Sequence, residues 1–309
     1  MNVIRTDGPW NAEGRAVCAA IGVFDGVHLG HQSILRRTMD DAGAANGIAA
    51  VITFDRHPNE VVAPERTPPL IYPLSKKLRA LKEFGADAVR IIHFDKAFSQ
   101  LAAEDFVRRL AAEAGNLKSI CVGAGFTFGH RRQGNVELLR RLGAKLSFAV
   151  DGVGDVRLEG ETVSSTRVRQ TVREGRFDLA GRLLGRDYTL AGTVRRGAQL
   201  GRKLGFPTAN VDVAGIVTPP TGVYAAEASV GGIRRCAAVN IGFRPTVETN
   251  AVTLHVEAHL VDFHEEIYGQ EMELLFLRKL REEQKFASLD ALKAQVEQDI
   301  AAARTAEKV

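Results

Sequence analysis

The stretch Ala16-Val-Cys-Ala-Ala-Ile-Gly-Val-Phe-Asp-Gly-Val-His-Leu-Gly-His31 runs from a continuous apolar segment directly into a glycine-rich turn. The apolar segment predicts a strand that is covered on both faces, and the residues after the turn predict a helix. Three glycines (Gly22, Gly26 and Gly30) permit a tight turn with close approach of the backbone, and a helix N-terminus attracts phosphate. The stretch therefore predicts an α/β fold with an anion site at this strand–helix junction.

The rest of the first half repeats the order of apolar strand and amphipathic helix. Further strands are expected at Gly47–Phe54, Ala88–Phe94, Ser119–Val122 and Lys145–Val150. A repeated strand–helix order predicts a parallel sheet covered by helices. Five prolines between Pro58 and Pro73 predict a long loop or lid there rather than a helix.

The pattern changes near Gly185–Asp187, where we expect a boundary between domains 1–186 and 187–309. Beyond it, apolar segments are separated by Gly/Pro turns without intervening helices, at Tyr188–Arg195, Gly222–Val230, Arg234–Ile241, Thr253–Leu260 and Met272–Lys279. This order predicts an antiparallel β-barrel or sandwich. Leu289, Leu292, Val296 and Ile300 then predict a final amphipathic helix.

The composition is that of an ordinary globular chain, with 45% hydrophobic and 25% charged residues. The net charge is only +4 and no run of five or six like charges occurs, so we expect no nucleic-acid partner. The sequence has no signal-peptide core and no apolar run of about 18 residues, so we expect a cytoplasmic protein without a membrane partner. Cys18, Cys121 and Cys236 stand far apart in apolar surroundings and predict buried free thiols. The sequence carries no signal of oligomeric state.

His28 and His31 follow the glycine turn and are candidates for the chemistry at this site. The turn contains neither Gly-Lys-Ser/Thr nor G-x-G-x-x-G, so it is not a Walker A loop or a Rossmann fingerprint. The two imidazoles could bind zinc or pack structurally. We prefer a third interpretation, in which both face ATP phosphates and stabilise charge that develops during nucleotidyl transfer.

A second segment, Ser164-Ser-Thr-Arg-Val-Arg169, precedes an amphipathic stretch. Its hydroxyls can cap a helix while Arg169 faces the same anion. Together with His-x-Gly-His, this segment resembles the nucleotidyltransferase superfamily, in which both motifs flank one triphosphate site.

The second half contains Gly197-Ala-Gln-Leu-Gly-Arg-Lys-Leu-Gly-Phe-Pro-Thr-Ala-Asn210, a glycine-rich loop joined to Pro-Thr-Ala-Asn. Glycines suit backbone approach to phosphates, and the oxygens of Thr208 and Asn210 suit Mg²⁺. Glu257 lies on the polar face of a predicted strand, which it shares with His255 and His259. The three could also form a metal site or be inert surface residues.

These motifs, with others in the same order, resemble the family of bacterial bifunctional riboflavin kinases/FAD synthetases. The other motifs are Leu183–Arg186, Gly222–Ala225, Val239–Thr246, Val256–Leu260, Tyr268–Gly269 and Arg281–Phe286. The resemblance implies an N-terminal nucleotidyltransferase domain and a C-terminal six-stranded barrel. It implies that ATP phosphorylates riboflavin to FMN in the barrel, with Mg²⁺. The N-terminal domain would then transfer AMP from a second ATP to FMN, giving FAD and pyrophosphate.

The resemblance also implies roles for residues of the first domain. The catalytic group would be His28, His31 and Arg169. Contacts to ATP would come from Gly22, Phe24, Asp25, Gly26, Gly30, Ser164 and Thr166. The flavin would lie near Phe54, Pro58, Phe126 and Phe128.

In the barrel, Glu257 would act as base on the ribityl hydroxyl, and Thr208 and Asn210 would hold Mg²⁺. Further contacts to substrates would come from Gly197, Gly201, Lys203, Gly205, Pro207, Arg281 and Phe286.

Two positions depart from the family pattern, both in the first domain. Gly125 stands where the family usually has Asn or Asp, and Arg56 replaces a proline. Arg56 could compensate by binding the FMN phosphate. The alternatives are a kinase with an impaired first domain, a different nucleotidyltransferase that acts on a small phosphorylated alcohol, and a flavin-binding regulatory protein without turnover.

Overall fold

A computed structural model describes residues 1–4, 10, 14–197, 201, 205–245 and 252–307. Tertiary contacts divide the chain into two units, Met1–Ser165 and Thr166–Val309.

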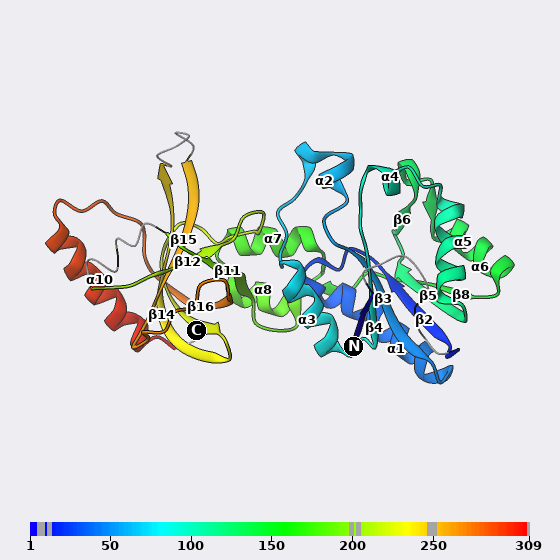
Figure 1. Cartoon of the computed structure of the whole chain (residues 1–309), viewed down its shortest axis with the longest axis horizontal. Helices are drawn as coiled ribbons and strands as arrows, with labels where there is room; N and C mark the ends of the chain where they lie inside the picture. Colours follow the sequence, from blue (N-terminus) through cyan, green and yellow to red (C-terminus); the bar gives the residue numbers. More distant parts are fainter. Residues whose placement is uncertain (5–9, 11–13, 198–200, 202–204, 246–251, 308–309) are drawn as a thin grey trace. The chain divides into compact units, whose positions relative to one another are not determined.

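Parallel strands form the centre of the first unit (Figure 1). They are β1 (Asn2–Ile4), β2 (Val17–Ile21), β3 (Ile48–Phe54), β4 (Ala88–Ile92), β5 (Leu117–Gly123) and β8 (Ala149–Val153). Their order is β1-β4-β3-β2-β5-β8, with parallel pairing throughout, which confirms the predicted α/β sheet. The strand expected at Lys145–Val150 begins later, because a helix continues to Leu146.

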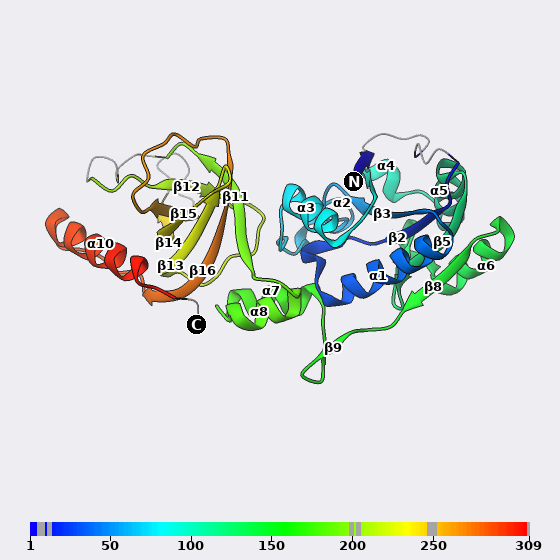
Figure 2. The same cartoon turned by 90° about the horizontal axis from the view of Figure 1, so that it is seen from below.

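Helices cover both faces of this sheet (Figure 2). Ala20 and Val51 pack in one cluster with α1 (Leu29–Ala44) and α3 (Leu74–Phe84). Their neighbours Ala19 and Ala50 pack in another cluster with α5 (Ala103–Ala114) and α6 (Val136–Leu146). Successive residues of β2 and β3 therefore point to opposite faces, and each strand is buried on both sides.

The strand order reverses between β2 and β5, since β3 and β4 extend the sheet on one side of β2 and β8 extends it beyond β5. Doubly wound sheets bind ligands at such a switch point, outside the carboxyl ends of the strands. The loop Gly22–His31 leaves the carboxyl end of β2, and residues 124–128 leave the carboxyl end of β5. The topology thus brings separately predicted segments to one edge.

The proline-rich segment contains two one-turn helices, α2 (Asn59–Val62) and η2 (Pro64–Arg66). The expectation of a loop without helix is therefore wrong for these residues. Pro58 is the N-cap of α2, and Pro64 opens η2, where a missing N–H costs little. The remaining short elements are η1 (Asp25–Val27), α4 (Lys96–Ser99), β6 (Thr127–Phe128), η3 (His130–Arg132), β7 (Gly134–Asn135), β9 (Arg157–Leu158) and β10 (Glu161–Thr162).

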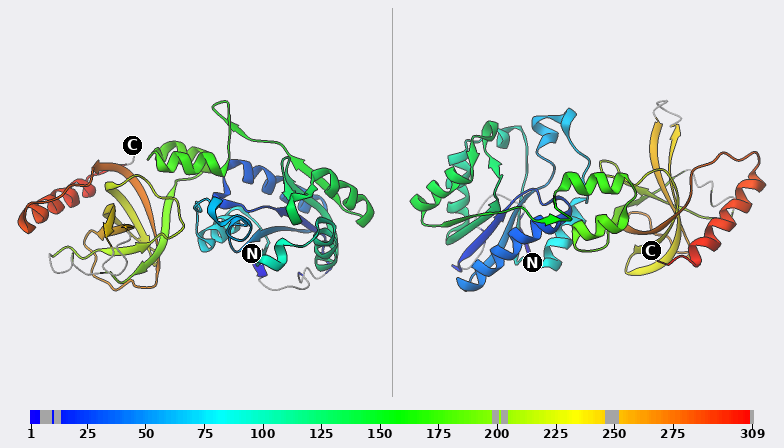
Figure 3. Two further views of the ribbon diagram at one scale, coloured as in Figure 1. Left: turned by 90° about the horizontal axis from the view of Figure 1, so that it is seen from above. Right: turned by 180° about the vertical axis from the view of Figure 1, so that it is seen from behind.

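Six antiparallel strands close a barrel in the second unit (Figure 3). They are β11 (Thr189–Arg195), β12 (Ala209–Asp212), β13 (Gly222–Val230), β14 (Ile233–Pro245), β15 (Val252–Leu260) and β16 (Glu271–Arg281). Because β16 pairs with both β11 and β13, the structure is a closed barrel and not a sandwich. The final helix is α10 (Leu289–Arg304), as predicted, but Leu289 at its start is 60% exposed.

Two helices precede the barrel, α7 (Ser165–Arg173) and α8 (Phe177–Leu184), and both belong to the second unit except for Ser165, the first residue of α7. The ring of Phe177 stacks on those of Tyr188 and Phe276, at centroid distances of 6.4 and 5.0 Å. These contacts anchor α8 to the barrel. The domain boundary expected near residue 186 stays a prediction.

Cys18 and Cys121 are buried free thiols, but Cys236 is exposed, so the prediction for Cys236 is wrong. Cys236 alternates along β14 with the fully buried Ala237, and its side chain therefore lies on the outer face of the barrel. Among the described residues, no helix has both the length and the apolar character of a membrane span.

Phe177→Ala should destabilise the barrel unit by about 1–3 kcal/mol, since the half-buried ring stacks on two aromatic rings of the barrel. The chain has one tryptophan, and the buried Trp10 lies in the first unit. The midpoint temperature of the barrel's unfolding, followed by circular dichroism, should fall. The midpoint of the transition followed by Trp10 fluorescence should stay the same. A matching shift of the fluorescence transition would contradict the assignment of α8 to the barrel.

Candidate active sites

The loop after β2 has a backbone that few residues adopt easily. Phe24 and Val27 are completely buried yet have positive φ values of 51° and 43°, which is strained for bulky and β-branched residues. Gly26 has φ of 78°, and a Cβ there would lie 2.9 Å from Ile71 Cδ1. Burial on every side holds this turn in its shape.

His28 and His31 lie at the start of α1 with their rings stacked, 3.6 Å between centroids and 19° between planes. The His31 N–H donates to His28 Nδ1 at 3.4 Å, so His28 is the N-cap of α1. The first N–H groups and the dipole of a helix favour an anion in front of it. Among the described residues, neither histidine belongs to a group of three ligands suited to a metal ion.

Asp25 fixes the next segment of chain to this loop. Its buried carboxylate accepts hydrogen bonds from the N–H of Ile71 at 2.9 Å and of Tyr72 at 3.2 Å. The backbone oxygen of Asp25 accepts from the Ser165 hydroxyl at 3.1 Å. Ser164, beside Ser165 in the chain, is therefore held near the loop, and its contact with a phosphate stays a prediction.

Thr166 and Arg169 lie in α7, which belongs to the second unit, and Arg169 is buried. Their contact with a phosphate stays a prediction.

Three of the predicted flavin residues, Phe54, Phe126 and Phe128, belong to one row of aromatic rings, whereas Pro58 is the N-cap of α2. Phe54 contacts Phe98 at a centroid distance of 6.3 Å, and Phe126 stacks on Phe128 at 5.4 Å. Phe106 links the two pairs, 5.9 Å from Phe98 and 5.9 Å from Phe128. The partly exposed members Phe54, Phe98 and Phe126 offer ring surface that suits a flat aromatic ligand.

Sequence reasoning missed Phe94 and Phe98, although both follow the carboxyl end of β4, and β3, the neighbouring strand, ends at Phe54. The Phe94 ring meets the edge of Phe54 at 5.4 Å. Strand position was therefore an available signal for both residues.

Asp55 connects the residues after β3 to the residues after β4. Burial alone would raise the pKa of the Asp55 carboxyl, but hydrogen bonds from the Phe94 N–H, the His93 ring and Arg56 lower it below its ordinary value. Arg56 pairs with Asp55 at 3.3 Å, and its side chain is 42% exposed. A Cβ at Gly125 would meet nothing within 4 Å, so the structure leaves room for the family's Asn or Asp.

Lys77 of α3, which sequence reasoning also missed, is buried beside the carboxyl ends of β2 and β3. Its Nζ donates to Val23 O at 3.2 Å, Thr53 Oγ1 at 3.1 Å and Phe54 O at 2.9 Å. Burial lowers the pKa of Lys77 to about 8, although the carboxylates of Asp25 and Asp55 favour the charged form. The sequence gives no sign of this burial, because the lysine stands in an amphipathic helix.

In the second unit, the barrel and α10 enclose a cavity of about 300 Å³. Its lining contains the predicted residues Gly201, Thr208, Asn210, Glu257, Arg281 and Phe286. On adjacent strands Glu257 pairs in register with Asn210 on one side and Asn240 on the other. Asn240 is a lining residue that sequence reasoning missed, because only the strand register places it beside Glu257.

The glycine-rich loop packs closely on the two predicted metal ligands. A Cβ at Gly197 would collide with the Asn210 side chain, and one at Gly201 would lie 3.3 Å from Thr208 Oγ1. Gly205 has φ of 92°, which favours glycine. Lys203 lies outside the described residues.

Pro207 O contacts His259 Nδ1 at 2.9 Å. His255, Glu257 and His259 do not form a metal-ligating group in the described part of the chain.

Arg281 is fixed at the edge of the cavity by Asp299 of α10. Its Nη2 lies 2.7 Å from Asp299 Oδ2, and its Nε donates to both oxygens of that carboxylate. The guanidinium also lies over the Phe286 ring, 5.7 Å from the centroid. Arg281 and Phe286 thus line the cavity together, and their contact with riboflavin stays a prediction.

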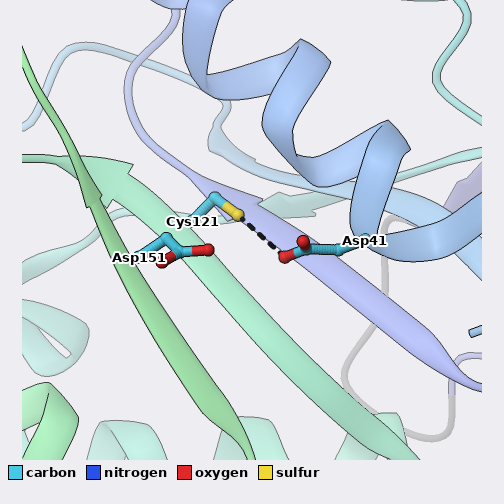
Figure 4. A group of neighbouring side chains, drawn as sticks. All are labelled: Asp41, Cys121 and Asp151. Atoms are coloured by element: carbon cyan, nitrogen blue, oxygen red, sulfur yellow. Dashed lines mark hydrogen bonds between the residues drawn. The ribbon is translucent and has the colours of Figure 1, made fainter. Parts of the chain in front are cut away.

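Asp41, Cys121 and Asp151 form the group of described residues whose ligand atoms could approach one metal ion (Figure 4). Arg37 already pairs with both carboxylates, at 3.1 Å from Asp41 and 2.7 Å from Asp151. Burial raises the pKa of the Cys121 thiol to about 12, and the thiol donates to Asp41 at 3.5 Å. The cluster is an ion-pair network between α1 and the sheet.

Comparison with known proteins supports the same division of the chain. The family model described as FAD synthetase matches residues 11–167, and the one described as riboflavin kinase matches residues 184–306. Bifunctional riboflavin kinase/FMN adenylyltransferases from Pseudomonas fluorescens and Escherichia coli are 40% and 38% identical. The matches cover 94% and 92% of this chain, and 93% and 90% of those proteins.

A solved structure from Streptococcus pneumoniae, described as a macrolide-efflux protein, has a TM-score of 0.81 and 27% identity. It covers 99% of this chain and 100% of its own.

Replacing Lys77 by Met should change how the stability of the first unit depends on pH. Because the pKa is about 8 in the folded chain and 10.5 in the unfolded chain, protonation opposes folding below pH 8. This opposition fades as the pH rises from 8 to 10.5. Relative to Lys77→Met, the unfolding free energy of the wild type should therefore rise by up to about 3 kcal/mol over this window. Denaturant titrations followed by Trp10 fluorescence test this, and a difference independent of pH would contradict it.

Proposed function

The chain belongs to the family of bifunctional riboflavin kinase/FMN adenylyltransferases, and we propose which of its residues serve each of the two reactions. The enzyme phosphorylates riboflavin to FMN with ATP, and it transfers AMP from ATP to FMN to give FAD and pyrophosphate. Both family models match and the relatives carry both activities in their names, so nothing favours a kinase with an impaired first domain.

The assignment of the adenylyltransferase reaction rests on one observation: the rings of His28 and His31 stack at the start of α1. In this reaction a phosphate oxygen of FMN attacks the α-phosphorus of ATP, and the bond from that phosphorus to pyrophosphate breaks. The imidazoles would stabilise negative charge on the phosphates as this bond breaks. Ser164, which lies in the same unit, would add its hydroxyl to this phosphate cradle.

The aromatic row would bind the isoalloxazine ring of FMN through Phe54 and Phe126, with Pro58 beside them. Arg56 is half exposed next to Asp55 and would bind the FMN phosphate.

The position of Glu257 between Asn210 and Asn240, in the cavity that the barrel and α10 enclose, supports the kinase assignment. Glu257 would accept the proton of the ribityl hydroxyl as its oxygen attacks the γ-phosphorus of ATP and ADP leaves. Arg281 and Phe286 would border the riboflavin.

The donors at Thr208 and Asn210 fit Mg²⁺, because both offer neutral oxygens and both line the cavity. Gly197 and Gly201 support this fit, since a side chain at either position would press on one of these ligands. When bound there, Mg²⁺ would neutralise charge on the ATP phosphates.

Changing both His28→Ala and His31→Ala should slow FAD formation from FMN by about 10²–10³ for each lost contact that stabilises charge. Riboflavin phosphorylation by the same molecules should continue, because Glu257 and its neighbours lie in the other unit. Chromatographic resolution of riboflavin, FMN and FAD measures both reactions. Equal loss of the kinase rate in a folded variant would refute the separation of the sites.

Glu257→Gln keeps the shape of the side chain but removes the proton acceptor, so FMN formation should fall by about 10²–10⁴ at saturating Mg²⁺. Thr208→Val should instead raise the Mg²⁺ concentration that the kinase requires. Glu227→Gln is a matched control, since Glu227 pairs with Arg234 and does not line the cavity. A near-normal kinase rate in Glu257→Gln would remove Glu257 from this role.

A further inference from the structure

Lys77 joins the carboxyl ends of two neighbouring strands. Regular pairing of β2 with β3 ends at Ile21 and Ile52, after which the Gly22 N–H donates to Ile52 O. Beyond that point, Lys77 Nζ contacts Val23 O from one strand end, and Thr53 Oγ1 and Phe54 O from the other. The Lys77 ammonium therefore continues the connection between the strands where their own ladder stops.

All three N–H donors of this ammonium are used within the protein, since an ammonium has three donors and Lys77 has three acceptors at 2.9–3.2 Å. Thr53 completes the arrangement, because its hydroxyl donates to the same Val23 oxygen at 3.0 Å. No donor remains for a substrate. Lys77 can therefore act on a reaction only through the segments that it holds.

Those segments lead to the two halves of the proposed adenylyltransferase site. Val23 continues into the turn that carries His28 and His31, and Phe54 begins the aromatic row. The separation of the two backbones at Lys77 therefore sets the separation of the proposed ATP and FMN positions. Transfer between two substrates depends steeply on such alignment, because a misplacement of about 1 Å can cost about 10²-fold in rate.

We infer that Lys77 is a positioning residue for FAD formation, which aligns FMN with ATP by holding the turn after β2 and the end of β3 together. The inference rests on the proposed function of these two segments. It assigns Lys77 to the rate of adenylyl transfer and not to the binding of either substrate alone.

Lys76 provides a matched control on the same helix. It is as buried as Lys77, with 7% exposure for each, but its Nζ lies over the Tyr72 ring, 4.5 Å from the centroid. A general need for a buried lysine in α3 would make the two positions equivalent, whereas the inference rests on the contacts of Lys77 with Val23 O and Phe54 O.

The experiment compares Lys77→Met, Lys77→Arg and Lys76→Met in the full chain. In Lys77→Met, kcat for FAD formation should fall about 10- to 100-fold, while KM for FMN and for ATP should change less than about threefold. Lys77→Arg keeps a charged donor and should recover part of the lost kcat. Lys76→Met should stay within about threefold of the wild type, and riboflavin phosphorylation in the barrel should be unchanged in all three variants.

Thr53→Val adds an independent measurement, since it removes the hydroxyl between Lys77 and Val23 at nearly constant volume. Its kcat for FAD formation should fall about three- to tenfold, and the double variant with Lys77→Met should lose less than the product of the single losses. If Lys77→Met fails to fold, as shown by Trp10 fluorescence, the Thr53→Val result decides the inference.

A wild-type kcat in Lys77→Met, or an increase in KM at unchanged kcat, would overturn the inference. Equal losses in Lys77→Met and Lys76→Met would also overturn it. These outcomes are distinct from a failure of the proposed ATP site, which would show as a full rate of FAD formation in the His28→Ala and His31→Ala variant.

Discussion

The buried carboxylate of Asp25 is the contact on which the first site depends. It accepts the N–H groups of Ile71 and Tyr72, and so fixes the chain that enters α3 against the turn after β2. Ile71 in turn packs where a Cβ on Gly26 would stand, and the turn is held at its positive φ values. A buried carboxylate without such partners would be costly, so loop, turn and helix must form together.

This constraint also places the two histidines. The strained turn places His28 at the N-cap of α1. There its imidazole stacks on the ring of His31, which lies about one helical turn further along the chain. Ser165 contacts the backbone of Asp25, so the second motif meets the first at the same residue. Strain stored in a turn persists when the surrounding contacts outweigh it, and such turns are typical of ligand sites.

The barrel site is organised differently, by strand register. Asn210, Glu257 and Asn240 stand side by side because three antiparallel strands pair at those residues. Side chains directly opposite each other on one face lie about 4.5–5.5 Å apart, so a rigid sheet brings the amides and the carboxylate together without a strained loop. The ion pair of Arg281 with Asp299 then joins α10 to the same cavity, so the final helix contributes to a site that is otherwise built on strands.

The sequence alone determined the parallel sheet, the antiparallel second half and the residues of both motif sets, because apolar periodicity and glycine turns are local properties of the chain. Only the tertiary structure decided that Lys77 is buried on strand ends, that Phe94 and Phe98 extend the aromatic row, and that Asn240 lies beside Glu257. It also placed Cys236 on the outer face of the barrel and helices α7 and α8 with the second unit. These features depend on contacts between residues far apart in the chain. A lysine in an amphipathic helix has the same local pattern whether its ammonium meets water or the carboxyl ends of two buried strands.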